Sequence, residues 1–275
     1  MTTRPLFTST PRPAERTANP WLLPLAAAQP DGMRPRLRLV AFPYAGGSAT
    51  VYRGWPQRLV NAGVPVQVLG LQLPGRGLRL AEAPVADFGL LVSLLTEALR
   101  GVCSGLPTVF FGHSLGALLA FETACALQRQ GAAAPVMLVV SGRAAPDGDT
   151  PTVLRDCRHD DDFVDELRRL QGTPDEVLDD PELLALLIPT IRADFALLKS
   201  WRKTPGRVWE GGPLLAMGGR DDAHVPLQAV QAWRAQAGAG FEFRSYGGGH
   251  FFLHEQEREL VADLARRLDM LMVAA

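Results

Sequence analysis

Short, continuous apolar runs alternate with longer amphipathic stretches along most of this 275-residue chain. Runs such as Thr108–Phe111 and Val136–Val140 contain no polar alternation, which is typical of strands buried on both faces. Strands that alternate with helices need crossover connections, and such connections make neighbouring strands parallel. The pattern therefore predicts an α/β fold with a mostly parallel central sheet flanked by helices.

The same pattern places the individual elements. Strands are expected at residues 36–42, 66–71, 108–111, 136–140, 213–217 and 241–246. Helices are expected at residues 55–61, 88–102, 115–130, 225–237 and 255–271. Because Pro and Gly residues such as Pro43, Gly46-Gly47 and Pro74-Gly75 end several of these runs, the predicted boundaries follow the turn residues.

Two stretches depart from the alternation. Residues 1–34 are rich in Pro, Thr, Ala and Arg without periodicity, so we expect a mobile N-terminal leader before a folded domain at 35–275. Residues 151–205 contain two helical patterns, at 160–171 and 181–201, but no strand-like run. An insertion of this kind between consecutive strands is interpreted as a helical lid; a helical ornament packed on the sheet is the alternative.

Composition excludes several classes of protein. The 28 Lys and Arg residues against 29 Asp and Glu residues give a net charge of −1, which argues against nucleic-acid binding. No run of about 18 apolar residues predicts a membrane span, and prolines break up the apolar segment at 21–28, so it is not read as a signal peptide. Three unclustered cysteines favour neither a disulfide framework nor structural zinc. We therefore expect a cytoplasmic protein.

One short motif joins a buried-type strand to a helix. Gly112-His113-Ser114-Leu115-Gly116 matches G-x-S-x-G. In this nucleophile elbow a serine lies on a strained turn, and the small residues on either side prevent clashes. Its hydroxyl projects above a helix N-terminus, which favours developing negative charge. Ser114 is therefore a candidate nucleophile, with a serine in an ordinary glycine-rich turn as the alternative.

A serine nucleophile needs a base, which follows it along the chain in this architecture. His250 comes after the strand at 241–246 and a triple-glycine turn, so it lies at a carboxyl end of the sheet. His159 lies in the charged insertion, and His224 is interpreted as a loop histidine. His254 follows His250 by four residues, but the pair lacks the glutamate of H-E-x-x-H and a third ligand, so no metal site is expected.

The orienting acid is expected at the end of another late strand. Asp221 and Asp222 both follow the strand at 213–217, and either carboxylate could serve. We prefer Asp222, which begins the loop proper.

The reaction also needs two backbone N–H groups directed at the oxyanion. Leu115, directly after Ser114, supplies one candidate. Ala45, which precedes Gly46-Gly47 after the first strand, supplies the other, although the two glycines could simply form a turn.

Five motifs occur together in one order along the chain. They are Phe42-Pro43-Tyr44-Ala45-Gly46-Gly47, Leu73-Pro74-Gly75-Arg76, Gly112-His113-Ser114-Leu115-Gly116, Gly218-Gly219-Arg220-Asp221-Asp222 and Gly248-Gly249-His250-Phe251-Phe252. Together they resemble the type II thioesterases of polyketide and non-ribosomal peptide synthesis. The resemblance extends from about Asn19 to the final helix.

This resemblance implies an α/β-hydrolase fold with a helical lid. It implies that Ser114, Asp222 and His250 form the catalytic triad, with Asp222 preferred to Asp221, and that Ala45 and Leu115 form the oxyanion hole. It implies no metal and no dissociable cofactor, because the phosphopantetheine that carries the acyl group belongs to an acyl or peptidyl carrier protein. This chain has Tyr44 at a motif position where many members of that family have histidine.

The expected reaction is hydrolysis of the acyl thioester on the carrier protein, as editing of stalled or misprimed chains. Dedicated release of a medium-chain intermediate, a carboxylesterase, lipase or peptidase on the same fold, and a non-catalytic scaffold are the alternatives. Candidate residues for docking an acidic carrier protein are Arg76, Arg79, Arg202, Lys203 and Arg207, with ordinary solvated charge as the alternative.

Overall fold

A computed structural model describes residues 19–27, 34–146, 163–165, 167–168 and 178–274 of the chain. Its centre is a seven-stranded sheet in the order β1-β3-β2-β4-β5-β6-β7. All neighbouring pairs are parallel except β1 and β3. The strands are β1 Leu22–Leu25, β2 Leu37–Phe42, β3 Val66–Leu71, β4 Thr108–His113, β5 Met137–Ser141, β6 Leu214–Gly219 and β7 Phe241–Tyr246.

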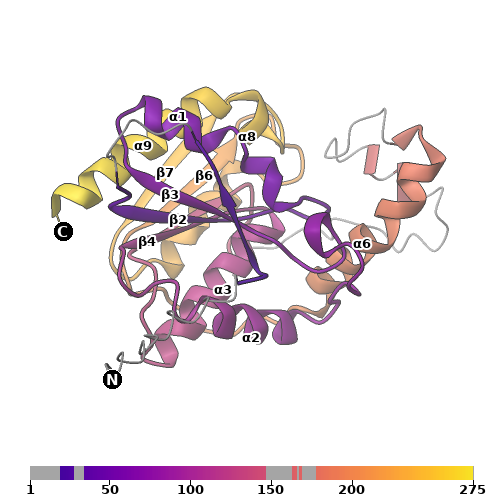
Figure 1. Cartoon of the computed structure of the whole chain (residues 1–275), viewed down its shortest axis with the longest axis horizontal. Helices are drawn as coiled ribbons and strands as arrows, with labels where there is room; N and C mark the ends of the chain where they lie inside the picture. Colours follow the sequence, from indigo (N-terminus) through magenta and orange to yellow (C-terminus); the bar gives the residue numbers. More distant parts are fainter. Residues whose placement is uncertain (1–18, 28–33, 147–162, 166, 169–177, 275) are drawn as a thin grey trace, which may run out of the picture.

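Two layers of helices cover the sheet (Figure 1). One layer contains α1 Trp55–Asn61 and α9 Glu257–Ala274, which pack against each other and against one apolar face. The opposite layer contains α2 Phe88–Leu99 and α3 Leu115–Arg129, together with α7 Leu227–Gln231 and the 3-10 helix η3 Ala232–Gln236. The predicted α/β fold is therefore confirmed.

Most predicted elements appear with small shifts. The strands at 66–71 and 241–246 and the helix at 55–61 have the predicted bounds. β4 and β6 each extend two residues further than predicted, because Gly112-His113 and Gly218-Gly219 continue the ladders to their neighbours. The predicted helix at 225–237 is divided into α7 and η3, and the last helix begins at Glu257 after the short α8 Phe252–Glu255.

The N-terminal boundary at residue 34 is wrong. Leu22–Leu25, inside the predicted leader, form β1 and pair antiparallel with β3, with Leu22 opposite Leu71. Asn19 Nδ2 also donates to Ala98 O at 2.8 Å. A four-residue strand interrupted by Pro24 has no clear periodicity, and Pro24 is tolerated because β1 lies at the sheet edge. Residues 1–18 and 28–33 of the predicted leader lie outside the described residues.

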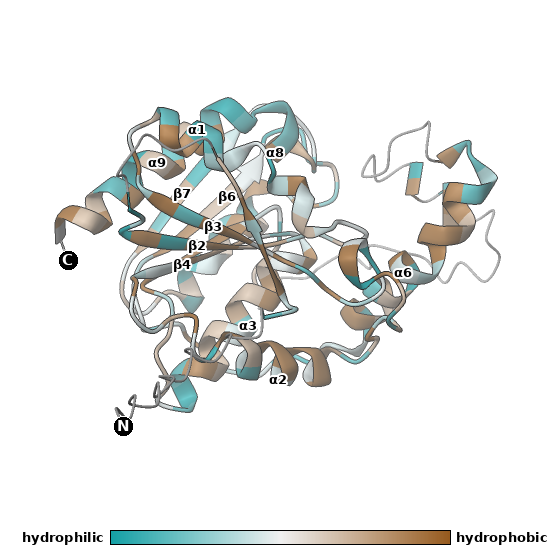
Figure 2. Ribbon diagram, viewed as in Figure 1, coloured by the Kyte–Doolittle hydropathy of each residue, from teal (hydrophilic) through white to brown (hydrophobic). Residues whose placement is uncertain are grey.

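Between β5 and β6 the described chain is helical. α6 Pro181–Ser200 is the main element, and its N-cap Asp180 accepts from the N–H groups of Glu182 and Leu183. Hydrophobic residues recur along α6 (Figure 2) and contribute to a separate apolar cluster. That cluster consists of Phe163, Val164, Leu167, Leu178, Ile191 and Phe195. The predicted helix at 160–171 lies largely outside the described residues.

Within the part of the chain that the structure describes, no helix is long and apolar enough to cross a membrane.

Candidate active site

Four loops meet where parallel strands end at the same edge of the sheet. They follow β2, β4, β6 and β7, and carry the segments 43–48, Ser114, 220–225 and 247–251 respectively. Because β4 lies near the centre of the strand order, the side chain that follows it is flanked by loops from both sides. The topology therefore brings together residues as distant in the sequence as Ala45 and His250, which are 250 − 45 = 205 positions apart.

Ser114 has the backbone strain expected of a nucleophile elbow. Its φ of 53° and ψ of −113° make it the one described residue other than glycine with a positive φ. Hydrogen bonds on both sides of the residue hold this conformation in place. Ser114 N donates to Ser141 O at 2.8 Å, and Ala117 N donates to Ser114 O at 3.1 Å.

The two glycines of the motif are required by close backbone contacts. A Cβ at Gly112 would lie 2.1 Å from Gly116 O, and a Cβ at Gly116 would lie 2.2 Å from Phe42 O. Neither neighbour is a flexible side chain that could move aside. The elbow therefore brings β4, α3 and the end of β2 closer together than any side chain allows.

Ser114, His250 and Asp222 form a continuous hydrogen-bonded series. His250 Nε2 lies 3.1 Å from Ser114 Oγ, and His250 Nδ1 lies 2.7 Å from Asp222 Oδ2. The Asp222 side chain is 1% exposed and that of His250 is 11% exposed. The three residues predicted as a triad are thus brought together in the arrangement in which a base takes a proton from a serine and an acid orients that base.

The two adjacent aspartates have different partners. Asp222 faces His250, while the exposed Asp221 accepts from Gly248 N at 3.1 Å and so braces the loop that carries His250. Burial by itself would raise the pKa of Asp222. The hydrogen bond and charge of His250, together with the N–H groups of His224 and Val225, outweigh burial and lower that pKa below its ordinary value.

The loop after β2 forms a tight turn beside the serine. Gly47 N donates to Tyr44 O at 2.9 Å, and Gly46 has a φ of +78°, which favours glycine at the third position of such a turn. Ala45 is half-buried and packs against the apolar cluster of α6. Leu115 lies on the other side, at the first position of α3.

Aromatic rings surround the histidine. Tyr44 OH lies 2.9 Å from His254 Nε2, and the rings of His113 and Phe251 lie 5.2 and 5.1 Å from that of His250. Burial raises the pKa of Tyr44 to about 12 and lowers the pKa of His113 well below its ordinary value, with the charges of His250 and His254 adding to the latter shift. No role in the site was predicted for His113 or Tyr44, and their places inside two of the five motifs were the available signal.

No group of three or more His, Cys, Asp or Glu side chains that could hold a metal ion occurs among the residues that the structure describes. His254, considered above as a metal ligand with His250, instead contacts Tyr44.

The structure corrects one predicted docking residue. Arg76 is 5% exposed and forms a bidentate ion pair with Asp194 of α6, so it does not present its charge at the surface. Arg79 pairs with Glu82 and lies over the Trp21 ring. The buried partner of Arg76 lies 118 residues further along the chain, so no local pattern indicates the ion pair.

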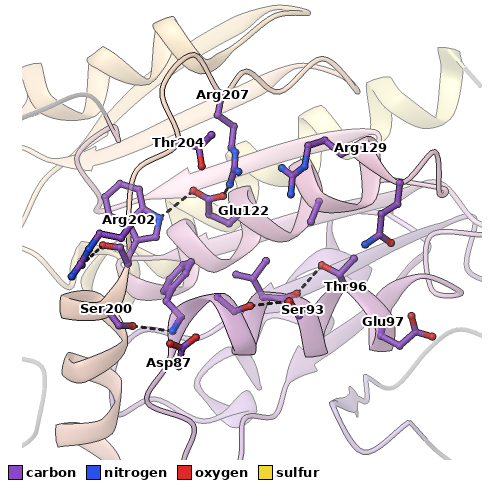
Figure 3. Close-up of a pocket in the computed structure, with 16 residues that line it drawn as sticks. Asp87, Ser93, Thr96, Glu97, Glu122, Arg129, Ser200, Arg202, Thr204 and Arg207 are labelled. Carbon is purple, nitrogen blue, oxygen red and sulfur yellow. Dashed lines mark hydrogen bonds and ion pairs between the residues drawn. The ribbon is translucent and has the colours of Figure 1, made fainter.

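Two of the predicted basic residues after α6, Arg202 and Arg207, border a cavity of about 460 Å³ (Figure 3). Ser114 is not among the residues that line this cavity. Arg207 pairs with the buried Glu122 of α3, and Trp201 Nε1 donates to the same carboxylate at 3.1 Å. Arg202 is exposed and donates to the carbonyl groups of Lys199 and Trp201. Of the five predicted docking residues, Arg202 and Lys203 are the exposed ones.

The parallel sheet, the strained serine after its central strand and the helical insertion before β6 define the α/β-hydrolase fold. A family model described as a thioesterase domain matches residues 37–268. The chain therefore belongs to the thioesterase family, and its relatives identify it with the type II thioesterases of polyketide and non-ribosomal peptide synthesis.

Three relatives illustrate this. The gramicidin S biosynthesis protein GrsT of Aneurinibacillus migulanus is 36% identical over 239 residues, which cover 86% of this chain and 91% of GrsT. The thioesterase PikA5 of Streptomyces venezuelae is 36% identical over 84% of this chain and 81% of its own length. The structure of the type II thioesterase BorB, from the borrelidin biosynthetic cluster, has a TM-score of 0.75 and 34% identity, and covers 90% of this chain and 97% of BorB.

Proposed function

We propose that this thioester hydrolase uses Ser114 as its nucleophile, His250 as its general base and Asp222 as the acid that orients the base. The observation that carries the proposal is the series of hydrogen bonds from Asp222 through His250 to Ser114 at the carboxyl edge of the sheet. The strain at Ser114 supports it, because strained backbone persists where the surrounding structure holds it and often marks a functional residue.

The proposed reaction has two halves. Ser114 Oγ attacks the thioester carbonyl carbon while its proton passes to His250 Nε2, and the N–H groups of Leu115 and Ala45 stabilise the oxyanion. The intermediate expels the thiol, which takes the proton from His250. Water, deprotonated by His250, then attacks the acyl-serine, and His250 returns that proton to Ser114 Oγ as the acyl–oxygen bond breaks and the free acid leaves. The reaction needs no metal or dissociable cofactor.

We propose an acyl or peptidyl carrier protein as the partner, with the thioester on its phosphopantetheine arm and editing of stalled or misprimed acyl groups as the role. The biosynthetic settings named for the relatives support this proposal. We further propose that the helical insertion acts as a lid, since α6 lies beside the sheet (Figure 1) and its Asp194 accepts from Gly46 N in the loop after β2.

The deciding experiment exposes a panel of carrier proteins to the wild type and to Ser114→Ala, and follows the acyl groups by mass spectrometry. The panel carries acetyl, propionyl, malonyl, medium-chain and aminoacyl thioesters. Serine-dependent clearing of many short acyl groups supports editing, whereas a sharp preference for one longer chain indicates dedicated release. Hydrolysis of simple oxygen esters without clearing of any carrier protein would instead support a carboxylesterase.

Arg202 and Lys203 are proposed to contribute to docking of the acidic carrier protein, because both are exposed at the end of α6. Reversing both charges is expected to raise KM for the carrier-bound substrate while sparing a small soluble thioester. Equal losses on both substrates would contradict this docking site.

A further inference from the structure

Asp194 is a fully buried acidic residue on the second half of α6. Its Oδ2 accepts from Gly46 N at 2.7 Å and from Arg76 NH1 at 2.6 Å, and its Oδ1 accepts from Arg76 NH2 at 2.6 Å. Arg76 NH1 also donates to Gly47 O at 3.2 Å. One carboxylate therefore joins the insertion helix, the turn after β3 and the loop after β2.

The buried pair is poorly explained by stability alone. Withdrawing two charges from water is costly, and apolar residues of similar volume commonly replace such a pair without loss of stability. The Arg76 side chain is 5% exposed and that of Asp194 is 1% exposed, so solvent compensates neither charge. In some proteins a buried pair of this kind fixes a particular geometry, and here the pair contacts Gly46 N and Gly47 O.

The geometry that the pair fixes is that of the turn at Tyr44–Gly47. Gly46 lies in this turn with a positive φ, and Asp194 accepts its N–H. Arg76 holds the following carbonyl, Gly47 O. Ala45, whose N–H is the proposed second oxyanion donor, lies directly before these two anchored residues. An oxyanion donor is effective only if it is preorganised where negative charge develops.

We propose that Arg76 and Asp194 are positioning residues for the oxyanion hole, so that the Ala45 N–H is held in place only while α6 is docked on the loop after β2. This inference rests on the proposed function of the Ala45 loop. In this arrangement the charge of Arg76 also offsets that of Asp194, which would otherwise oppose the negative charge that develops nearby. The insertion helix is thus part of the support of the catalytic site as well as a cover over it.

A neighbouring contact provides a matched control. Thr190 Oγ1, one turn before Asp194 on α6, donates to Gly75 O at 2.7 Å. This bond also joins α6 to the turn after β3, but it does not reach the Ala45 loop. Thr190→Val therefore weakens docking of the helix while leaving the pair and its bond to Gly46 intact.

The test compares the wild type, Asp194→Asn and Thr190→Val on a small soluble acyl thioester, and measures kcat, KM and Tm for each. Asp194→Asn is expected to lower kcat about 10- to 100-fold with KM within twofold, because a positioned transition-state donor is weakened rather than a substrate contact. Thr190→Val is expected to retain kcat within threefold even if its Tm falls equally. Equal values of kcat for the two variants would overturn the inference.

A double variant separates positioning from folding. Arg76→Met with Asp194→Leu replaces the pair with apolar side chains and is expected to retain the Tm of the wild type within a few degrees. Its kcat is expected to remain at least 10-fold below that of the wild type, because no group accepts from Gly46 N. Recovery of the wild-type kcat would overturn the inference.

A comparison of the wild type with Ser114→Ala tests the proposed function separately from the positioning role. If the wild type and Ser114→Ala hydrolyse the thioester equally, the proposed serine mechanism and this inference both fall. If hydrolysis depends on Ser114 but Asp194→Asn behaves as Thr190→Val does, only the positioning role falls.

Discussion

His250 receives its orientation from one carboxylate, although two are adjacent in the sequence. Asp222 is buried and lies 2.7 Å from His250 Nδ1, whereas the exposed Asp221 contacts the backbone of the following loop. The difference follows from where each side chain points as the chain leaves β6. At the residue scale, then, neighbouring positions of the same chemistry can have separate roles.

Asp222→Asn is expected to lower kcat about 10³- to 10⁴-fold, because an amide stabilises neither the needed tautomer of His250 nor its protonated form. Asp221→Asn is the matched control and should stay within a few-fold of the wild type. The measurement is kcat on a soluble acyl thioester. Comparable losses in both variants would contradict the assignment of Asp222.

The buried His113 predicts a dependence of stability on pH. Its ring is 0% exposed, its Nδ1 lies 3.0 Å from Ser141 Oγ, and burial lowers its pKa well below the ordinary value of 6.5. Below about pH 6.5 the unfolded chain binds a proton that the folded chain does not. The free energy of unfolding should therefore fall as the pH is lowered, by up to about 1.4 kcal/mol per pH unit for this proton.

Urea denaturation between pH 7.5 and 5.5 checks this prediction. The comparison variant is His113→Asn, which can retain a hydrogen bond to Ser141, and the quantity to compare is the slope with pH rather than the absolute stability. His254, whose pKa burial also lowers, contributes to the slope of both proteins. Parallel curves for the wild type and the variant would show that His113 contributes nothing.

At the scale of elements, the elbow depends on how closely β4, α3 and the end of β2 approach each other. Gly112 and Gly116 face backbone atoms rather than side chains, so the contact cannot relax through a change of rotamer. The same short distances that require glycine also hold Ser114 in its strained conformation. The glycines of the motif are therefore required by the packing of three elements as well as by the turn itself.

Gly116→Ala is expected to destabilise the fold by about 3 kcal/mol or more, because its Cβ would lie 2.2 Å from Phe42 O and 2.6 Å from Pro43 O. Gly101→Ala is the control, since no heavy atom lies within 4 Å of the added Cβ. Thermal unfolding of the two variants checks the difference. A Gly116→Ala protein with the Tm of the wild type would contradict the close approach in the structure.

At the scale of the whole molecule, a strand from the N-terminal segment forms one edge of the sheet. β1 pairs with β3, Trp21 O accepts from Gln72 N at 2.8 Å, and the Trp21 ring lies 4.2 Å from the guanidinium of Arg79. β3 leads directly into the turn that carries Arg76. The edge strand therefore supports the segment on which the proposed positioning pair depends.

Deletion of residues 1–27 is expected to cost about 2–4 kcal/mol of folding stability through the loss of β1 and its contacts. Deletion of residues 1–18 keeps those contacts and serves as the control. Chemical denaturation of both truncated proteins provides the measurement. Equal stabilities would show that β1 contributes little.

Local patterns along the chain were enough to predict several parts of the protein. Continuous apolar runs predicted the parallel sheet, and the spacing of glycines around Ser114 predicted the elbow, because both depend on residues close together in the chain. His250 could be chosen for the same reason, since the strand and glycine turn that position it precede it directly. Strand order at the carboxyl edge then brought these residues together.

The edge strand and the partner of Arg76 depend on contacts between distant segments. β1 owes its existence to pairing with β3 rather than to its own periodicity, so the sequence assigned it to a leader. From the sequence, Arg76 was predicted to be a surface charge. Its partner Asp194 lies on α6, 118 residues further along the chain, and only the folded chain brings the two together. Partners this distant leave no local pattern, because the contact is made by the packing of whole elements and not by the spacing of neighbours.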